Sequence, residues 1–528
     1  MVKSNRQASG RVAKTSLILA AGIGLSRVLG FLRDILMARL FGATAQSEAF
    51  IVAFRLPNLF RDLVAEGAVT SAFVPVLSWH RAKGDAENFW RLNSALLLRL
   101  LILLSVLAAA GVLAAPWVVR LVAPGFSADP EKVALTIRLA RILFPFIALV
   151  GLWAYFMGLL NTLGHFAVPA LGSAILNLAM ILACVFWVSP ESPGVTVVAL
   201  SVMIGGVIQL LIELPPTLKR GFQWKWCWSH PGASEVLRLF GPRVLGSAVY
   251  QFSVLIDTAF ASLGSIVGPG AVAALYFSNR LVQLPLAMFG NTFAQASLPT
   301  LAEQAAHRDF DGFRTTLLSV VRMVGFVVLP SSIGLMVLAY PIVGGLFERG
   351  AFDHHATVMT AQTLIYYCFG LLAYSLSNVL TGAFYAVKDT WTPVRLSIEA
   401  LVVNVVFCVL LMWPLQVGGL ALAAAISNTF NAYRLIQYME RRLEAPIFLP
   451  LVRASSLTMI ASLAMGGACW LSWVFVGSRL HPWLGLSVVV LLGAAAYFII
   501  CSFLRIPELA SLLRWLQHIP LIQRFASR

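Results

Sequence analysis

Long apolar segments dominate this sequence and leave few folds open to it. Fourteen of them are long enough to form a membrane-spanning helix of about 20 residues, and Gly, Pro, Asn, Asp or charged residues separate them. The segments are 16–41, 46–79, 92–122, 133–161, 166–189, 194–218, 235–263, 270–302, 314–346, 358–386, 392–413, 417–439, 453–476 and 482–504. Only 11% of the 528 residues are charged, against about a quarter in a soluble domain. The sequence therefore predicts an all-α polytopic membrane protein with 14 transmembrane helices, and it excludes a soluble enzyme.

Lys and Arg residues are distributed unequally between the two sets of predicted loops. The loops on the side of the N-terminus contain 20 of them, whereas the other side has four: Arg120, Lys132, Arg349 and Arg479. Because cytoplasmic loops are enriched in Lys and Arg, both termini are expected in the cytoplasm. The formal net charge of +16 reflects this enrichment, so it does not indicate a nucleic-acid partner.

The sequence also contains a weak internal repeat. Three pairs of helix-breaking residues are each separated by 224 positions: Pro75 and Pro299, Gly158 and Gly382, Pro169 and Pro393. Because this offset spans six helices, an even number, the copies should share one orientation and form two six-helix lobes in a parallel pseudo-twofold repeat. The predicted domains are 1–220 with helices 1 to 6, 221–444 with helices 7 to 12, and 445–528 with two additional helices and an amphipathic C-terminal tail. The alternative is a coincidence in a chain with 25 Pro and 39 Gly.

Several charged residues lie inside the predicted membrane segments. The first segment contains Arg27, Arg33 and Asp34, and the second contains Glu48, Arg55, Arg61, Asp62 and Glu66. A charge at the bilayer centre costs at least about 2.5 to 3.5 kcal/mol, so each needs a partner, water or a substrate. The spacing puts Glu48, Arg55, Asp62 and Glu66 on one face of their helix, and Arg27 and Asp34 on one face of theirs. We expect these faces to line a common interior, with an internal salt-bridge network as the alternative.

The helical rise places three of the arginines near the middle of the membrane. Arg27, Arg55 and Arg280 lie roughly 14 to 16 Å from the starts of their segments. The planar guanidinium group stays charged and matches phosphate or carboxylate oxygens, so these residues predict an anionic substrate. The sequence has no GxxxxGK[ST] phosphate-binding loop and no recognisable catalytic set, which favours transport over enzymatic chemistry. Asp257, alone in the seventh segment, is either a cation ligand or a contact between helices.

Two motifs carry a family resemblance. SRVLGFLRDILMARLFG (26–42) and EAFIVAFRLPNLFRDLVAEGAVTSAFVPVL (48–77) resemble the signature region of the MurJ/MviN lipid II flippases, which belong to the multidrug/oligosaccharidyl-lipid/polysaccharide exporter superfamily. The resemblance extends over essentially the whole chain, including LYFSNRLVQLP around Arg280. It implies two six-helix lobes around a central cavity, and two extra helices that form a groove for a polyprenyl tail.

The resemblance also implies a substrate and roles for individual residues. The substrate is lipid II, an undecaprenyl-pyrophosphate-linked disaccharide-pentapeptide, which is moved by alternating access from the inner to the outer leaflet of the bacterial inner membrane for peptidoglycan synthesis. Matching motif positions assign pyrophosphate binding to Arg27, Arg33 and Arg280. Arg55 and Arg61 complete the expected substrate-binding set, and the expected gate or ion-pair residues are Asp34, Glu48, Asp62 and Glu66.

Coupling and partners follow from the same resemblance. Some members bind sodium near an acid of the seventh helix, so Asp257 and Asn404 are the possible sodium ligands here, while Cys408 replaces an expected oxygen ligand. Gln283 stands where some members have an acid. Sodium or the membrane potential is the expected driving force, with no other cofactor. The expected state is a monomer surrounded by membrane lipids, with cell-wall synthesis proteins as associates. The alternatives are a flippase for another polyprenyl-pyrophosphate-linked glycan, or a MATE-like multidrug exporter with an acidic or aromatic cavity.

Overall fold

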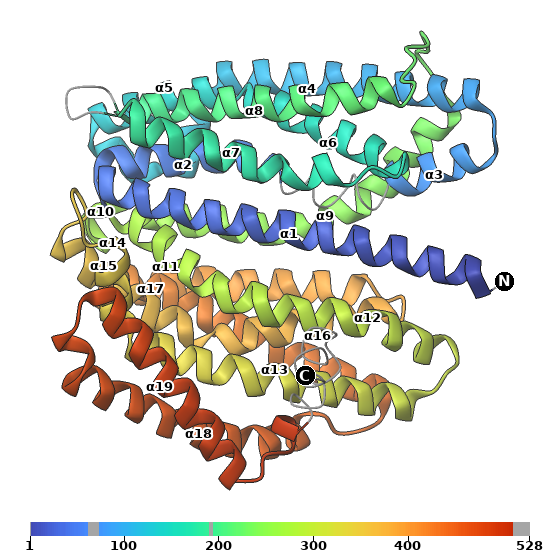
Figure 1. The fold of residues 1–528 in the computed structure, drawn as a ribbon. Helices are drawn as coiled ribbons and strands as arrows, with labels where there is room; N and C mark the ends of the chain where they lie inside the picture. The colour runs from blue at the N-terminus through green and yellow to red at the C-terminus, as the bar shows by residue number, and fades with distance from the viewer. Residues whose placement is uncertain (1, 62–72, 189–193, 511–528) are drawn as a thin grey trace. The chain divides into compact units, whose positions relative to one another are not determined.

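The computed structural model describes residues 2–61, 73–188 and 194–510, and all regular secondary structure in these ranges is helical. The chain divides into two compact units. Unit 1 comprises Met1–Ser265 and Arg349–Phe352, and unit 2 comprises Ile266–Glu348 and Asp353–Arg528. Figure 1 shows long helices in each unit that run alongside one another. This confirms the predicted all-α fold class.

Unit 1 is built from the first nine α-helices and a short 3₁₀ turn. These elements are α1 (Val2–Phe41), α2 (Ala45–Arg61), α3 (Val74–Ala82), α4 (Ala86–Val122), η2 (Pro124–Ala128), α5 (Pro130–Leu143), α6 (Phe146–Thr162), α7 (Ala167–Phe186), α8 (Gly194–Lys219) and α9 (Pro231–Ala261). Helix α1 packs along α7, α7 packs against α8, and α2 packs against α5 (Figure 1). Helix α9 contacts α3 and α4, so it is part of unit 1.

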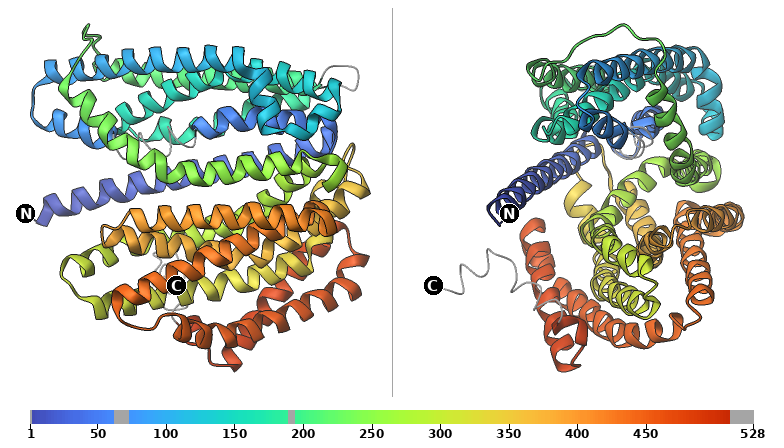
Figure 2. Two further views of the ribbon diagram at one scale, coloured as in Figure 1. Left: turned by 180° about the vertical axis from the view of Figure 1, so that it is seen from behind. Right: turned by 90° about the vertical axis from the view of Figure 1, so that its right-hand side faces the viewer.

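Unit 2 contains the remaining helices after the short α10 (Gly264–Val267) at the boundary. They are α11 (Ala271–Pro285), the π-helical turn η3 (Leu286–Gly290), α12 (Asn291–Ala306), α13 (Phe310–Val337), α14 (Ala339–Phe347), α15 (His354–Phe369), α16 (Leu371–Ala386), α17 (Trp391–Leu443), α18 (Phe448–Phe475), η4 (Gly477–Arg479) and α19 (Pro482–Phe503). The last two helices form a hairpin whose first helix packs along α13 (Figure 2). The Tyr497 hydroxyl donates to the Phe326 carbonyl at 2.6 Å and fastens α19 to α13.

The helix boundaries repeat at the offset that the sequence suggests. Adding 224 to the starts of α4, α5 and α7 gives the starts of α13, α15 and α17, and the ends of α3, α6 and α8 give those of α12, α16 and α17. The residues that cap these helices repeat as well. Asp85 and Asp309 cap α4 and α13, and Asp129 and Asp353 cap α5 and α15, each by accepting a hydrogen bond from a backbone N–H three residues later. Local capping chemistry therefore defines the same helix starts in both copies.

Two left-handed backbone positions follow the same repeat. Gly84 and Gly164 have φ of +78° and +76° after α3 and α6, where only glycine is free of strain. The equivalent residues in the second copy are Arg308 and Lys388, with φ of 58° and 61°. The second copy thus keeps the turn without the residue type that the turn favours.

Several segments predicted as single helices are interrupted in the structure. Phe144 and Pro145 separate α5 from α6, and Gly370 separates α15 from α16 with a bend of 45°. In α17, Gln416 has non-helical angles (φ 51°, ψ −134°), so residues 391–415 and 417–443 form two helices, as predicted. Apolar periodicity continues across Pro145 and Gly370, which is why the sequence did not predict these breaks.

Apolar side chains on the outside of the helices support membrane insertion. On α4, Leu113, Trp117 and Leu121 are at least 70% exposed, which in water would form a large unfavourable apolar surface. In the described ranges, eight helices are long and apolar enough to cross a membrane, or nine if the bent α15 and α16 form one span. Each of the 14 predicted segments coincides with helical residues, so that count is consistent with the structure.

The two contact-based units differ from the domains expected from the repeat. Helix α9 belongs to unit 1, whereas the repeat assigns it to the second lobe from residue 221. The two divisions describe different properties, because one follows contacts and the other follows internal similarity. The lobes at 1–220 and 221–444 therefore stay a prediction.

Candidate substrate site

Arg33 and Asp34 form a buried charged pair on α1. The Arg33 guanidinium donates to Asp34 Oδ1 from Nη2 at 2.7 Å and from Nε at 3.0 Å, and Nη1 donates to Asn177 Oδ1 on α7 at 2.9 Å. Asn177 in turn donates to the Ser26 carbonyl at 3.0 Å. Arg33 and Asp34 are only 6% and 2% exposed. This pair joins α1 to α7, as the salt-bridge alternative proposed.

Arg27 lies in a different environment, two turns earlier on the same helix. Its side chain is exposed, and within the described ranges it makes no hydrogen bond or ion pair. Arg27 and Asp34 were expected to share one face of the helix, but only Asp34 is buried. Arg27 is therefore accessible to an external anion.

The charged residues of α2 contact two different helices. Glu48 is 3% exposed and pairs with Lys132 on α5, whose ammonium also lies 3.9 Å from the centre of the Phe126 ring. Arg55 reaches α9, where it donates to the Val254 carbonyl at 3.1 Å and to the Thr258 hydroxyl. Among the described residues, Glu48 therefore contacts α5 and Arg55 contacts α9, and the expected common charged interior stays a prediction.

Arg61 is the last described residue of α2, and its side chain is partly buried. Asp62 and Glu66 lie outside the described residues. Their expected roles as gate or ion-pair residues therefore stay predictions.

Arg280 on α11 has polar neighbours on its own helix. Its guanidinium donates to the Tyr276 hydroxyl at 3.1 Å and to Gln283 Oε1 at 3.3 Å, and it lies 5.0 Å from the centre of the Tyr276 ring. Gln283 also donates to Asn279 Oδ1 at 2.7 Å. Gln283, which stands where some family members have an acid, is therefore an uncharged acceptor that orients Arg280. It lies about one turn before the π-helical η3.

The two expected sodium ligands belong to different units. Asp257 is a partly buried residue of α9 in unit 1, and Asn404 is 1% exposed on α17 in unit 2. Cys408 Sγ lies 3.9 Å from Asn404 Oδ1. In the part of the chain that the structure describes, no group of three or more His, Cys, Asp or Glu residues is placed to hold a metal ion.

Comparison with known proteins identifies the family. Residues 37–494 match the family described as MurJ, Lipid II flippase MurJ. The chain belongs to the MurJ family. It is 35% identical to a probable lipid II flippase MurJ of Vibrio cholerae over 94% of this chain and 97% of that one. It is also 32% identical to the lipid II flippase MurJ of Burkholderia cenocepacia, over 90% and 94% of the two chains.

Solved structures of the MurJ family and of related exporters share the fold. A lipid II flippase MurJ in an inward closed conformation matches with a TM-score of 0.78 at 23% identity, over 92% of this chain and 98% of that one. An inward-facing MATE multidrug transporter matches with a TM-score of 0.69 at 16% identity, over 79% and 94%. At these identities the structures support the fold alone.

Sequence reasoning found the charged residues of this MurJ family member but missed their partners. Asn177, Lys132 and Thr258 complete the sites of Arg33, Glu48 and Arg55 from helices far away in sequence. Lys132 was placed in an outer loop, yet it occupies the first turn of α5. A polar residue in an otherwise apolar segment, such as Asn177 among the residues of α7, was the available signal.

Proposed function

We propose that this chain is a lipid II flippase that moves its substrate from the inner to the outer leaflet of the bacterial inner membrane. The observation that carries the proposal is the contrast between Arg27 and Arg33. Arg33 has Asp34 and Asn177 as partners, whereas Arg27 is exposed in the apolar part of α1. A cation in this position needs an anion or water, and the pyrophosphate of lipid II is a matching anion.

In this mechanism Arg27 and Arg280 bind the pyrophosphate, and Arg61 adds charge at the end of α2. Arg33 and Arg55 support the site, because their contacts fix α1 against α7 and α2 against α9. The polyprenyl tail stays in the bilayer or in a groove at α18 and α19, which avoids the cost of moving the charged headgroup through hydrocarbon. Alternating exposure of the bound headgroup to the two sides then completes translocation.

The proposal also covers location and assembly. The protein acts as a transporter and performs no covalent chemistry, so lipid II leaves with unchanged mass. Both termini face the cytoplasm, which is supported by the 20 to four distribution of Lys and Arg. It functions as a monomer, surrounded by membrane lipids and associated with cell-wall synthesis proteins.

Substitutions at Arg27 and Arg280 test the proposal. Lysine keeps the charge but loses the two-pronged hydrogen bonding, so Arg27→Lys and Arg280→Lys should impair flipping, and Ala should impair it further. Losing one charge-assisted contact of about 1.5 to 3 kcal/mol should weaken lipid II binding by about ten- to a hundredfold. The readouts are growth with the variant as sole copy and lipid II binding to the purified protein. The exposed Arg479, changed to Ala, is the matched control. Unchanged binding and growth in both Ala variants would reject the site.

Sodium coupling through Asp257 and Asn404 is a second part of the proposal, and the repeat supports it. Asp257 and Asn404 are the repeat equivalents of Arg33 and Met180, which contact each other across α1 and α7 at 4.0 Å. The Asp257 carboxylate and the Asn404 side-chain amide both offer oxygen atoms, which hard cations prefer, although Cys408 contributes a thiol beside Asn404. Sodium should raise the melting temperature of the wild-type protein and not that of Asp257→Asn. An equal shift in both proteins would exclude Asp257 as the ligand.

A further inference from the structure

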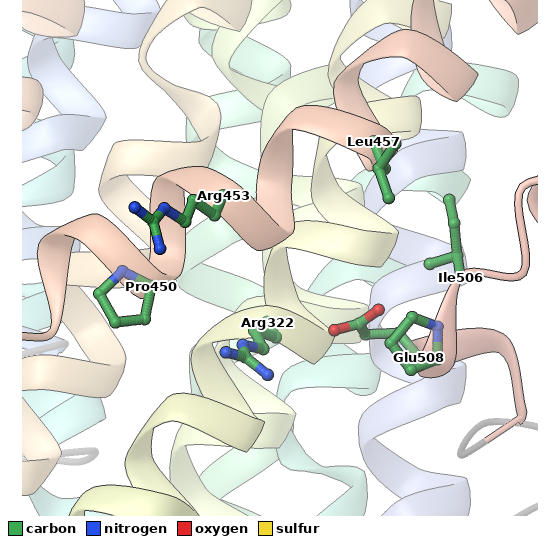
Figure 3. A pocket seen from close by; sticks show the side chains of 7 residues that line it. Arg322, Pro450, Arg453, Leu457, Ile506 and Glu508 are labelled. Atoms are coloured by element: carbon green, nitrogen blue, oxygen red, sulfur yellow. The ribbon is translucent and has the colours of Figure 1, made fainter.

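A charged pocket lies in unit 2 where α18 begins and α19 ends. Its volume is about 420 Å³, and its lining residues are Arg322 from α13, Pro450, Arg453 and Leu457 from α18, and Ile506, Pro507 and Glu508 after α19 (Figure 3). This volume falls within the range of small-ligand sites. Neither Arg27 nor Arg280, the residues proposed to bind lipid II, is among its lining residues.

The three charged side chains of the pocket lack charged partners among the described residues. The Arg322 Nε is buried without a hydrogen-bond acceptor, and Glu508 is only 9% exposed. Figure 3 shows the Glu508 carboxylate turned toward the side of the pocket where Arg322 lies, but no ion pair within 4.0 Å joins them. Arg453 is exposed, whereas Glu508 and the Arg322 Nε are buried, and a buried charge is costly without a partner. The arrangement of charges therefore fits a ligand that carries both signs.

We propose that this pocket binds the headgroup of phosphatidylethanolamine from the adjacent membrane leaflet. Its phosphate would accept hydrogen bonds from Arg322 and Arg453, and its primary ammonium would donate to Glu508. Phosphatidylglycerol has the phosphate but no ammonium, and phosphatidylcholine has a quaternary ammonium without N–H donors. Each of these two lipids therefore leaves Glu508 without a hydrogen-bonded cation.

The surface beside the pocket suits the acyl chains of the same lipid. Leu457 lines the pocket and is 42% exposed, and Ile460 and Leu463 continue along α18 at 57% and 59% exposure. The residues after α19 close the other side, and the pocket lies at the membrane-surface end of the hairpin. Basic pockets between membrane helices at a bilayer surface are known lipid-headgroup sites. A lipid should therefore bind much more tightly than free O-phosphoethanolamine, which has the same charges and no chains.

Lipid binding to the full-length purified protein tests the proposal. Native mass spectrometry would compare dioleoyl phosphatidylethanolamine, phosphatidylglycerol and phosphatidylcholine at equal concentration, with O-phosphoethanolamine as the soluble probe. Wild-type protein should bind phosphatidylethanolamine about tenfold or more tightly than the other two lipids. Arg453→Gln should weaken the binding of phosphatidylethanolamine and of phosphatidylglycerol about tenfold, because it removes a hydrogen-bond donor to the phosphate. Glu508→Gln should remove only the preference for phosphatidylethanolamine over phosphatidylglycerol.

Arg479→Gln removes one charge at the opposite end of the same hairpin and should change none of these affinities. Equal binding of the three lipids to wild-type protein would overturn the proposal without any variant. It would also be overturned if Glu508→Gln kept the full preference, or if O-phosphoethanolamine competed at the same concentration as the lipid.

Discussion

At the residue scale, Arg27 and Arg33 belong to one motif but have different environments. The sequence predicts their depth in the membrane and does not predict their partners. The apolar length of the first segment and the helical rise give the depth of Arg27 and Arg33. They do not give the partner, because Asn177 is 144 positions away from Arg33. Burial of Arg33 and exposure of Arg27 depend on how other helices pack around α1. Depth is thus a local property of the sequence, whereas pairing is a property of the packed helices.

The buried pair predicts a large stability effect that Arg27 should not share. Asp34→Asn removes the carboxylate and leaves the Arg33 cation buried, which should cost about 3 to 5 kcal/mol. Arg27→Gln, which also removes a single charge but at an exposed site, should alter stability by less than about 0.5 kcal/mol. Thermal unfolding of the purified proteins measures the difference. Similar melting temperatures for the two variants would show that the pair does not stabilise α1.

At the element scale, helix boundaries were more predictable than helix breaks. Asp, Gly and Pro near the ends of the apolar segments located most boundaries within a few residues. The Asp caps at positions 85 and 309 and at 129 and 353 provide a stronger repeat signal than Pro and Gly alone, because each accepts the same backbone hydrogen bond. The break at Gly370 was not predicted because it depends on a tertiary contact. Gly370 approaches Ala425 on α17 so closely that an added Cβ would lie 2.5 Å from the Ala425 Cα.

The repeated turns predict opposite effects of exchanging their residues. Lys388→Gly should stabilise the protein by up to about 1 kcal/mol, since a left-handed conformation strains a residue with a Cβ. Gly164→Lys should destabilise it by about 1 kcal/mol through backbone strain at φ +76°, since an added Cβ there meets no atom within 4 Å and causes no clash. Melting temperatures should rise for the first variant and fall for the second. Shifts of the same sign would contradict the strain argument.

The start of α9 should depend on pH through His230. Its Nδ1 accepts from the Gly232 N–H at 3.1 Å, and burial, with His80 beside it, lowers its pKa below the ordinary value of 6.5. The unfolded chain therefore binds a proton first, so this contribution is complete above about pH 6.5 and is lost as the pH falls toward the lowered pKa. His230→Asn keeps an acceptor for the cap without a titrating group.

Melting temperatures between pH 7.5 and 5.5 test this dependence. The wild-type protein should lose more stability on acidification than His230→Asn does. His355→Asn, at an exposed position, should behave like the wild type. Identical pH profiles for wild type and His230→Asn would contradict a role for the imidazole.

At the scale of the whole molecule, the fold class followed from apolar segments and the orientation from loop charge. Cysteine labelling tests that orientation. Five of the six native cysteines are buried, so replacing the half-buried Cys227 leaves a background with little reactivity. Ser127→Cys should react with a membrane-impermeant thiol reagent added outside the cell, and Ser234→Cys should not. Both positions are exposed in the structure. Labelling of Ser234→Cys alone would reverse the proposed orientation.

The matching helix boundaries are consistent with an origin of this chain by gene duplication and fusion. Caps and left-handed turns at equal positions in two stretches of the chain are what the duplication of a half-length gene would produce. An ancestor with six membrane crossings returns to the side from which it started, and two identical molecules would insert in the same direction without any change in loop charge. Such molecules would be suited to a symmetric dimer, with each subunit offering the same surface to the other. Fusion would then free each half to change separately, so that position 33 carries an arginine and the equivalent position 257 carries an aspartate.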